Sequence, residues 1–318
     1  MTIQTETNEL QVQYYLSKEG DVPFWDHPLM YGHRKLPKNY RPFVNVEQTI
    51  NAYQRKLLDE KDFTVLKVVG DAIAANEDQI RRYLISKMSR SEASKILERL
   101  RRNGFVDRWH CRLENDEAEE IRPPAPFTLG IAGYKLLKHF YPETPFMNPN
   151  SWDNHNIKTL QRYVAMNELR CLLIETRTTK GWVWNGVLDH NRAIKKPLGT
   201  ALVSTPKADI NLIIERAQMS QDFVGFLRGK LHQWKKVFEV KRSLPIQGVT
   251  ETVPIVVIYT STLSVAEHIH AQLMLDTYPF TVWLCVEEFF EEHGLAKSCF
   301  APQGQEVKRM YLDFFDKA

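Results

Sequence analysis

Hydrophobic residues recur at helical spacing in the first half of this chain and gather in strand-like runs in the second. Between residues 46 and 75, apolar side chains repeat every three or four positions, which predicts two helices. Asn76 is suited to cap a third helix, EDQIRRYLISKM, because its side chain can accept a backbone hydrogen bond. The periodic part of the chain therefore begins as a series of short helices.

The best-marked helix is predicted over residues 89–105, SRSEASKILERLRRNGF. At about 100° per residue, its apolar and polar side chains separate onto opposite sides. The side expected to be buried carries Ala93, Ile96, Leu97 and Leu100, and the side expected to be exposed carries Ser91, Lys95, Glu98 and Arg102. Ser89 with Glu92 has the pattern of a capping box at the start, and Asn103-Gly104 is a stop signal.

After Gly104 the pattern changes to extended runs. Residues 105–113 alternate like a strand, residues 121–130 form a second extended run, and AGYKLLKHF is helical again. Helix, helix, tight turn and helix, followed by two strands, is the order of a winged helix-turn-helix domain, which we place at residues 46–141. The segment between the strands carries five acids, at positions 114, 116, 117, 119 and 120. Acids repel phosphates, so base contacts are expected from the helix at 89–105.

The flanking segments complete the predicted organisation. Residues 1–45 lack a helical or strand period and read as an arm that packs on the domain or on a partner subunit. Alternatively, its cations Arg34, Lys35, Lys38 and Arg41 touch the DNA backbone or minor groove. Prolines and asparagines mark residues 142–154 as a linker.

Residues 155–318 alternate helices with strand-like runs, which indicates an α/β domain. Helices are expected at about 155–173 and 220–238 and over LSVAEHIHAQLML. The expected strands are 181–189, 201–205, 210–217, 253–260 and 280–286. The predicted fold class is thus α+β, with a winged helix-turn-helix domain followed by a domain with a small mixed sheet.

Composition changes this picture little. The chain is 43% hydrophobic and 25% charged, as in ordinary soluble proteins, and its four cysteines are scattered without metal-site or disulfide spacing. No basic segment precedes an apolar run at the N-terminus, and no apolar stretch approaches the length of a membrane span. We expect a cytoplasmic protein without a membrane segment, a metal or a cofactor.

The distribution of charge is more informative than its total, because basic residues are concentrated in one segment of the chain. Ten Lys and Arg against three acids lie between Arg81 and Arg112, a footprint that fits phosphates, although a solvated helix face is often equally basic. The residues expected to reach base edges are Ser91, Ser94, Lys95, Glu98 and Arg102. Those expected to contact phosphates are Arg81, Arg90, Arg99 and Arg108.

Several short motifs resemble the replication-relaxation family of plasmid and mobile-element proteins. They are KILERLRRNGFVDR (95–108), FTLGIAGYKLL (127–137), His155 with the helix after it, PLGTALVST…INLIIERA (197–217), FLRGKLHQWKKVF (226–238) and VPIVVIYTS (253–261). The resemblance spans roughly residues 60 to 290. It implies DNA binding in replication, transfer or gene control, through an N-terminal winged helix and a C-terminal domain like a reduced restriction-endonuclease core.

A nuclease of that architecture needs a carboxylate on one strand and acid-x-Lys on the next, so that metal and lysine act together. Leu198-Gly199 stand where the first acid would follow Pro197, and Glu215 is followed two residues later by Ala217. Glu239-Val240-Lys241, with Asp209, is a candidate for a migrated site.

Other chemistry-bearing patterns are weaker. His268 and His270 fall on different faces of a predicted helix, which disfavours a metal site. The acids Glu287, Glu288, Glu291 and Glu292 are expected in an amphipathic segment or at a partner surface. No phosphate-binding glycine motif is present.

The leading prediction is a sequence-specific double-stranded DNA-binding protein, not an enzyme. It would act as a transcriptional regulator or as a replication or transfer accessory factor of a plasmid or other mobile element. One recognition helix reads few base pairs, so a homodimer is expected. The rivals are a metal-dependent nuclease or nickase acting through the C-terminal domain, and a protein-interaction module that binds DNA only weakly.

Overall fold

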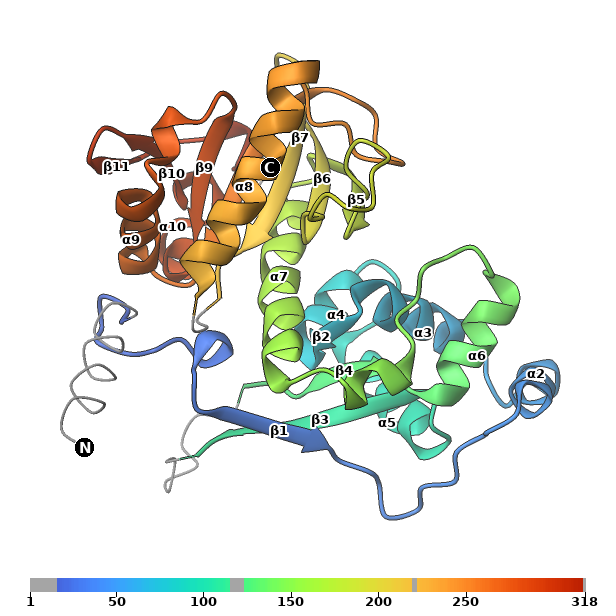
Figure 1. Ribbon diagram of the computed structural model, residues 1–318. Coiled ribbons are helices and arrows are strands. Elements are labelled where there is room, and N and C mark those ends of the chain that lie inside the picture. The colour runs from blue at the N-terminus through green and yellow to red at the C-terminus, as the bar shows by residue number, and fades with distance from the viewer. Residues whose placement is uncertain (1–15, 115–122, 219–221, 317–318) are drawn as a thin grey trace. The chain divides into compact units, whose positions relative to one another are not determined.

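A computed structural model describes residues 16–114, 123–218 and 222–316 (Figure 1). The chain divides into two compact units. We call Leu29–Cys171 the helical unit, and Met1–Pro28 together with Leu172–Ala318 the sheet unit. The fold is α+β, with a four-stranded antiparallel sheet and a seven-stranded mixed sheet among the described residues.

The helical unit carries the predicted series of helices. Its elements are β1 (Met30–Arg34), α2 (Val46–Gln54), α3 (Glu60–Ala72), β2 (Ala74–Asn76), α4 (Glu77–Tyr83), α5 (Arg90–Arg102), β3 (Val106–Leu113), β4 (Pro126–Leu129), α6 (Ile131–Phe140), a 3-10 turn (Pro149–Asp153) and most of α7 (Ile157–Glu175). The sheet has the order β1-β3-β4-β2. Leu66, Ile80, Leu97, Leu136 and Phe105 meet in one buried core, so α3 to α6 are held by a shared apolar cluster.

The predicted start of α4 is confirmed, but the helix ends at Tyr83 and not at Met88 as predicted. Asn76 caps α4 by accepting from the Gln79 backbone N–H at 2.9 Å, and the Gln79 side chain completes a capping box. Of the acids expected at the tip between β3 and β4, those at 116, 117, 119 and 120 lie outside the described residues.

Two other local predictions were wrong. The helix ending near Ala75 stops at Ala72, because Ile73 has φ +65° and the chain then enters β2. The segment 1–45, expected to contain no strand, contributes β1, which pairs antiparallel with β3. Its five residues are too few for a period, and Gly32 lets the strand approach Ile157, whose Cδ1 would lie 2.7 Å from an added Cβ.

The residues predicted as a linker, 142–154, lie within the helical unit, where Trp152 is buried and its ring packs against Trp109. The helix expected from about His155 is α7. The Asn167 side chain donates to the Ala72 and Ala74 carbonyls, which fixes α7 against the end of α3 and β2. The boundary between the two units falls inside α7.

The sheet unit contains the mixed sheet that the sequence predicts, but with more strands than the small sheet expected. Its elements are β5 (Thr179–Trp184), β6 (Gly199–Ser204), β7 (Asp209–Arg216), α8 (Phe223–Lys241), β8 (Val253–Thr260), α9 (Leu263–Leu273), β9 (Thr281–Val286), α10 (Phe290–His293), β10 (Cys299–Gln303), β11 (Glu306–Arg309) and 3-10 turns at Phe24–Asp26, Leu275–Thr277, Glu287–Phe289, Leu295–Lys297 and Asp313–Phe315. β10 and β11 were not predicted as strands, because they are short and half polar.

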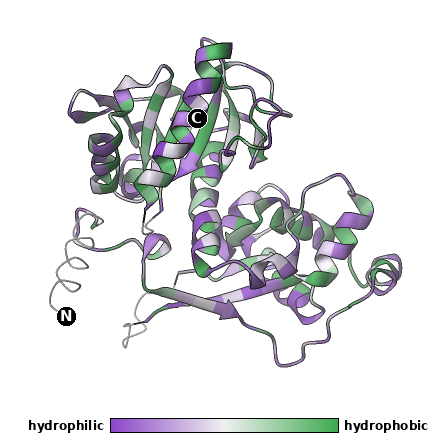
Figure 2. Cartoon of the chain, in the orientation of Figure 1, coloured by the Kyte–Doolittle hydropathy of each residue, from purple (hydrophilic) through white to green (hydrophobic). Residues whose placement is uncertain are grey.

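The strands of this sheet follow the order β11-β10-β9-β8-β7-β6-β5. β5, β6 and β7 are antiparallel, whereas β7, β8 and β9 are parallel and joined by α8 and α9. Leu231 and Trp234 of α8 pack with Ile269 of α9 on Val256 and Ile258, so both helices cover one sheet face. The central strands are correspondingly hydrophobic (Figure 2).

Candidate nucleic-acid interface

Helix α5 has the two faces that its sequence predicts. Ala93, Ile96, Leu97 and Leu100 are buried, and Ser91, Lys95, Glu98 and Arg102 are exposed. The buried stripe joins the core of the helical unit and thereby fixes the rotation of the helix about its axis. The polar row is presented to solvent as a consequence of that packing.

The two ends of α5 are set by local interactions. Ser89 accepts from the Glu92 backbone N–H at 3.2 Å. The predicted capping box is incomplete, since the Glu92 carboxylate turns to Lys61 Nζ at 2.5 Å. Gly104 has φ +72°, a conformation that favours glycine, and an added Cβ would lie 2.9 Å from Pro42. Helix α5 therefore ends against the segment that follows β1.

Three of the arginines expected to contact phosphates form ion pairs or hydrogen bonds with other residues of the helical unit. Arg90 pairs with Asp78, and Arg99 pairs with the buried Asp62 at 2.5 Å. Arg81 donates to Ser94 Oγ at 2.6 Å and to Glu77 at 2.5 Å, which links α4 to α5. The hydrogen bond that the Arg99 guanidinium donates to the Asp62 carboxylate raises the pKa of Arg99, which stays charged. These cations hold the helices together, so much of the local positive charge is already balanced.

Two of the residues expected to contact base edges also have partners within the helical unit. Ser94 is half-buried, and its hydroxyl donates to the Arg90 carbonyl at 3.1 Å while accepting from Arg81. Glu98 accepts from the buried Arg101 at 2.5 Å. By contrast, Ser91, Lys95 and Arg102 are exposed, and their side chains have no hydrogen bond or ion pair to another described residue.

The segment after β1 adds cations to the same surface. The Lys35 backbone N–H donates to the Arg108 carbonyl at 2.8 Å, the Arg41 N–H donates to the Arg102 carbonyl at 2.9 Å, and the Asn103 side chain donates to the Arg41 carbonyl at 3.3 Å. The side chains of Lys35, Lys38 and Arg41 are exposed. The chain thus brings these cations beside the end of α5. The sequence carried a signal for this, in the bases at 34, 35, 38 and 41, but its pattern favoured packing alone.

Arg34 differs from its neighbours because it points to acids. It pairs with Asp153 and lies 3.6 Å from the carboxylate of Asp107, which is buried. Burial raises the pKa of Asp107 to about 6, although the Arg34 charge opposes the shift. Arg34 therefore ties β1 to the unit and is not part of the exposed cationic surface.

We define the α5 surface as Ser91, Lys95 and Arg102 of the helix, Arg108 of β3, and Lys35, Lys38 and Arg41 of the segment after β1. Six of its seven side chains are cationic at neutral pH. Its helix has the size that the DNA major groove admits. An electropositive helix flanked by further cations can hold a polyanion and present a few side chains to its bases.

In the sheet unit, the structure brings together an acid and a lysine that the sequence separates. Glu215 at the end of β7 and Lys230 of α8 form a buried ion pair at 2.6 Å, with side chains 0% and 4% exposed. Glu215 also accepts from the Leu198 backbone N–H at 3.2 Å, and Lys230 donates to the Lys196 carbonyl at 2.8 Å. Lys230 was not predicted as a site residue, although a lysine on the apolar stripe of α8 was a signal for it.

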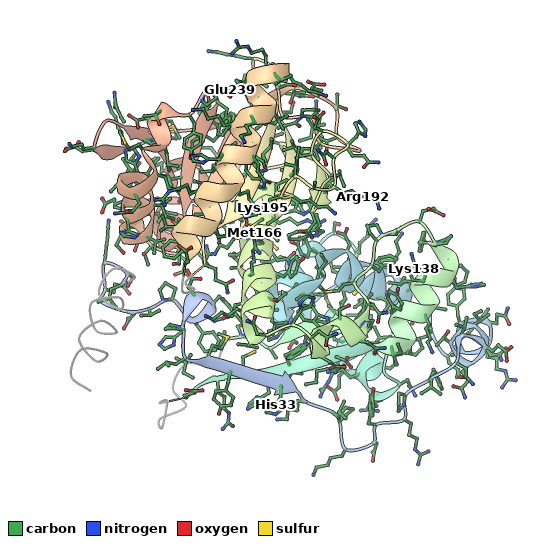
Figure 3. All side chains as sticks on the ribbon, viewed as in Figure 1. His33, Lys138, Met166, Arg192, Lys195 and Glu239 are labelled. Carbon is green, nitrogen blue, oxygen red and sulfur yellow. The ribbon has the colours of Figure 1, made fainter. Side chains whose placement is uncertain are left out.

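The other nuclease candidates are engaged in three different ion pairs. Asp209 pairs with Lys180, Glu239 with Lys235, and Lys241 with Asp189. Figure 3 shows Glu239 on α8. Among the described residues, no group of three or more His, Cys, Asp and Glu side chains is placed to hold a metal ion. His270 is buried, and its Nδ1 accepts from the Leu275 N–H at 3.3 Å.

Of the four acids around Phe289 and Phe290, Glu287 and Glu288 contact other elements of the sheet unit, whereas Glu292 lies 3.4 Å from its neighbour His293. Glu287 pairs at 2.9 Å with Arg216, which is buried and also lies 3.5 Å from Asp26. The Arg216 guanidinium lies over the Tyr259 ring at 4.2 Å. Glu288 accepts from the Leu263 N–H at 2.7 Å at the start of α9. These two acids stabilise the carboxyl ends of β7, β8 and β9.

Comparison with known proteins identifies no relative of this chain. No family model matches the chain, and neither the curated proteins nor the solved structures contain a match. No helix in the described part of the chain is long and apolar enough to span a membrane.

Proposed function

We propose that this protein binds double-stranded DNA in a sequence-specific manner through the α5 surface. The observation that carries the proposal is the exposed row Ser91, Lys95 and Arg102 on a helix whose opposite face is locked in the core. A helix fixed in this way keeps its side chains in register with a DNA groove. The flanking cations supply the salt-dependent part of the affinity.

The order of elements supports a winged-helix interpretation of the helical unit. Strand β2 lies between α3 and α4, β3 and β4 follow α5, and the three strands pair in the order β3-β4-β2. In this arrangement α4 and α5 form the helix-turn-helix and α5 is the recognition helix.

The role that we propose for each residue depends on whether its side chain already has a partner within the protein. Ser91, Lys95 and Arg102 are the best candidates for base edges, because their side chains are exposed. We assign the exposed Lys35, Lys38 and Arg41 and the half-buried Arg108 to phosphate contacts. Arg81, Arg90 and Arg99 would have to exchange an internal carboxylate for a phosphate, so we assign them primarily to holding α3, α4 and α5 together.

The biological role that we propose is that of a transcriptional regulator, or of a replication or transfer accessory factor of a plasmid or other mobile element. It rests on the resemblance of residues 60–290 to the replication-relaxation family. A homodimer belongs to this proposal, since two recognition helices would read two half-sites. Footprinting of DNA fragments selected by the protein would give the half-site spacing and test the symmetry.

For the sheet unit we propose a non-catalytic restriction-endonuclease-like domain. The succession β5, β6, β7, α8 and β8, with three antiparallel strands and a parallel fourth, supports it. The proximity of Glu215 and Lys230 is the one observation that favours the rival, a metal-dependent nuclease. Supercoiled plasmid incubated with the protein and Mg²⁺ or Mn²⁺ should stay intact. Cleavage that Glu215→Ala abolishes would establish the nuclease instead.

The direct test of DNA binding compares two double variants. Lys95→Ala/Arg102→Ala removes two side chains of the α5 surface, and Arg55→Ala/Lys67→Ala removes two exposed cations from α2–α3 of the same unit. With a selected duplex, the first variant should lose about 2 to 6 kcal/mol of binding free energy, at about 1 to 3 per base contact, and should tolerate base changes in the site. The second should bind like the wild type.

If the Lys95→Ala/Arg102→Ala variant binds as tightly as the wild type, α5 is not the recognition helix. If the wild-type protein binds DNA weakly and almost independently of salt, the helical unit is better explained as a protein-interaction module, the third function that the sequence allows.

A further inference from the structure

The sheet unit carries an exposed cationic surface of its own. It is formed by Arg192, Lys195 and Lys196 of the loop between β5 and β6 and by Lys236 of α8, and we call it the α8 patch. All four side chains are exposed, and none of them is paired with an acid in the described part of the chain. Figure 3 labels Arg192 and Lys195 on this loop.

The backbone of the loop is fastened to α8 at successive residues. The Lys195 N–H donates to the Gln233 side chain at 2.8 Å, and the Trp234 indole N–H donates to the Lys195 carbonyl at 2.8 Å. Lys230 donates to the Lys196 carbonyl at 2.8 Å. A loop held by three side chains of one helix keeps its cations in a defined position. This differs from an ordinary solvated lysine cluster, in which each position is independent.

The ion pair of Glu215 and Lys230 forms the base of this arrangement. Lys230 bonds to Glu215 and to the loop at once, and Glu215 also accepts from the Leu198 N–H immediately after the loop. The buried carboxylate and ammonium balance each other. The charge presented outward is therefore that of the four exposed cations.

The acids nearest in the sequence are engaged elsewhere. Asp189, which precedes the loop, pairs with Lys241, and Glu239 of α8 pairs with Lys235. Beside the patch lies Phe226, 41% exposed, with Lys195 Nζ at 5.1 Å from its ring centroid. Clustered cations without acidic partners, next to an aromatic ring, have the chemistry of a phosphodiester-binding surface.

We propose that the α8 patch contacts the sugar-phosphate backbone of double-stranded DNA. The inference rests on the proposed DNA-binding function and adds to it a second contact in the sheet unit. The patch carries no side chains arranged for bidentate reading of one base pair, so its contribution is independent of sequence. It raises the affinity for any duplex.

The test uses the full chain and two matched double variants. Lys195→Ala/Lys196→Ala removes two cations of the patch, whereas Lys207→Ala/Lys308→Ala removes two exposed lysines of the same unit outside it. On a selected duplex and on an unrelated duplex alike, the patch variant should bind on the order of tenfold more weakly near 0.1 M salt. The dependence of log affinity on log salt should be flatter by about two units, at about 0.9 per phosphate contact. The control variant should match the wild type.

A second measurement keeps the proposal testable if a variant folds poorly. Acetylation of the wild-type protein, with and without duplex, should show protection of Lys195 and Lys196 by DNA but not of Lys207 and Lys308. Equal acetylation of all four lysines with and without DNA, or equal binding by the patch and control variants, overturns the proposal.

The two proposals fail in distinguishable ways. If Lys95→Ala/Arg102→Ala loses specificity while the patch variant binds like its control, only the α8 patch is refuted. If specificity is unaffected by Lys95→Ala/Arg102→Ala yet Lys195 and Lys196 are protected, DNA is bound through the sheet unit and the role of α5 is refuted. A wild-type protein that binds neither duplex refutes both.

Discussion

Helices α5 and α8 are both basic and both bury an apolar stripe, but the ion pairs of α5 lie at the surface whereas an ion pair of α8 is buried. In α5, arginines at the surface bond to acids of neighbouring helices, as Arg90 does with Asp78 and Arg99 with Asp62. In α8, Lys230 is buried on Glu215, and the exposed charges nearby lie in the adjoining loop. A count of basic residues therefore says little about which cations are available. Their availability depends on the acids that the fold places beside them.

The energetic consequences of the two arrangements should differ sharply. Removing one partner of a buried ion pair leaves the other charge buried without a countercharge, which strongly destabilises the protein. An exposed ion pair contributes little to stability, because water screens the two charges. Four predictions test this comparison, from the largest expected effect to the smallest.

Replacing Lys230 by Met should destabilise the protein by about 3 to 5 kcal/mol, because it leaves the Glu215 carboxylate buried without a countercharge. Urea denaturation measures the change. Adding Glu215→Gln should recover much of the loss, since the amide oxygen can still accept from the Leu198 N–H. A single Lys230→Met variant as stable as the wild type would show that α8 and α5 do not differ in this way.

Asp107 lies between the two cases, because it is buried but only loosely paired with Arg34 at 3.6 Å. Its pKa of about 6 in the folded protein is above the unfolded value near ~3.9, so the folded state binds the proton more tightly. Stability should fall as the pH rises from about 4 to 6, by about 3 kcal/mol at most. In urea titrations across this range, Asp107→Asn should remove that slope. An unchanged slope would assign the pH dependence to other groups.

The start of α5 offers a matched pair of serines. Ser89→Ala removes the acceptor of the Glu92 N–H and should cost about 1 kcal/mol. Ser91→Ala, two residues later on the exposed face, should change stability by less than about 0.5 kcal/mol. Thermal unfolding of both variants measures the difference. Equal losses would mean that the helix start is not fixed by Ser89.

The smallest effect is expected for Arg90→Ala, at about 0 to 1 kcal/mol of stability, because Arg90 and Asp78 are both solvent-accessible. DNA titrations at several salt concentrations would sharpen the comparison within α5. Arg90→Ala should change the salt slope by less than Lys95→Ala does, since the Arg90 charge already has a partner. The opposite order would show that the internal pair opens on binding.

The sequence located α5 well because its signals are local. The boundary at Ser89, the stop at Asn103-Gly104 and the two faces all depend on residues within one or two turns of each other. The short strand β1 escaped prediction because it is formed by pairing with β3, far along the chain, and β10 did so because it is short and half polar. The same limit applies to the site. The helical period predicted that Lys95 and Arg102 are exposed, but no local pattern indicated that Arg90 and Arg99 have acidic partners.

Spacing along the chain predicted the α+β class, most of the helices, the longer strands and the apolar side of α5. Spacing along the chain is sufficient for these features, because helical and strand periods fix where each side chain points. Only the tertiary structure decided which charges meet. Lys230 reaches Glu215 across 15 residues and Arg99 reaches Asp62 across 37. Contacts of this kind depend on how elements pack, and no local pattern encodes the partner.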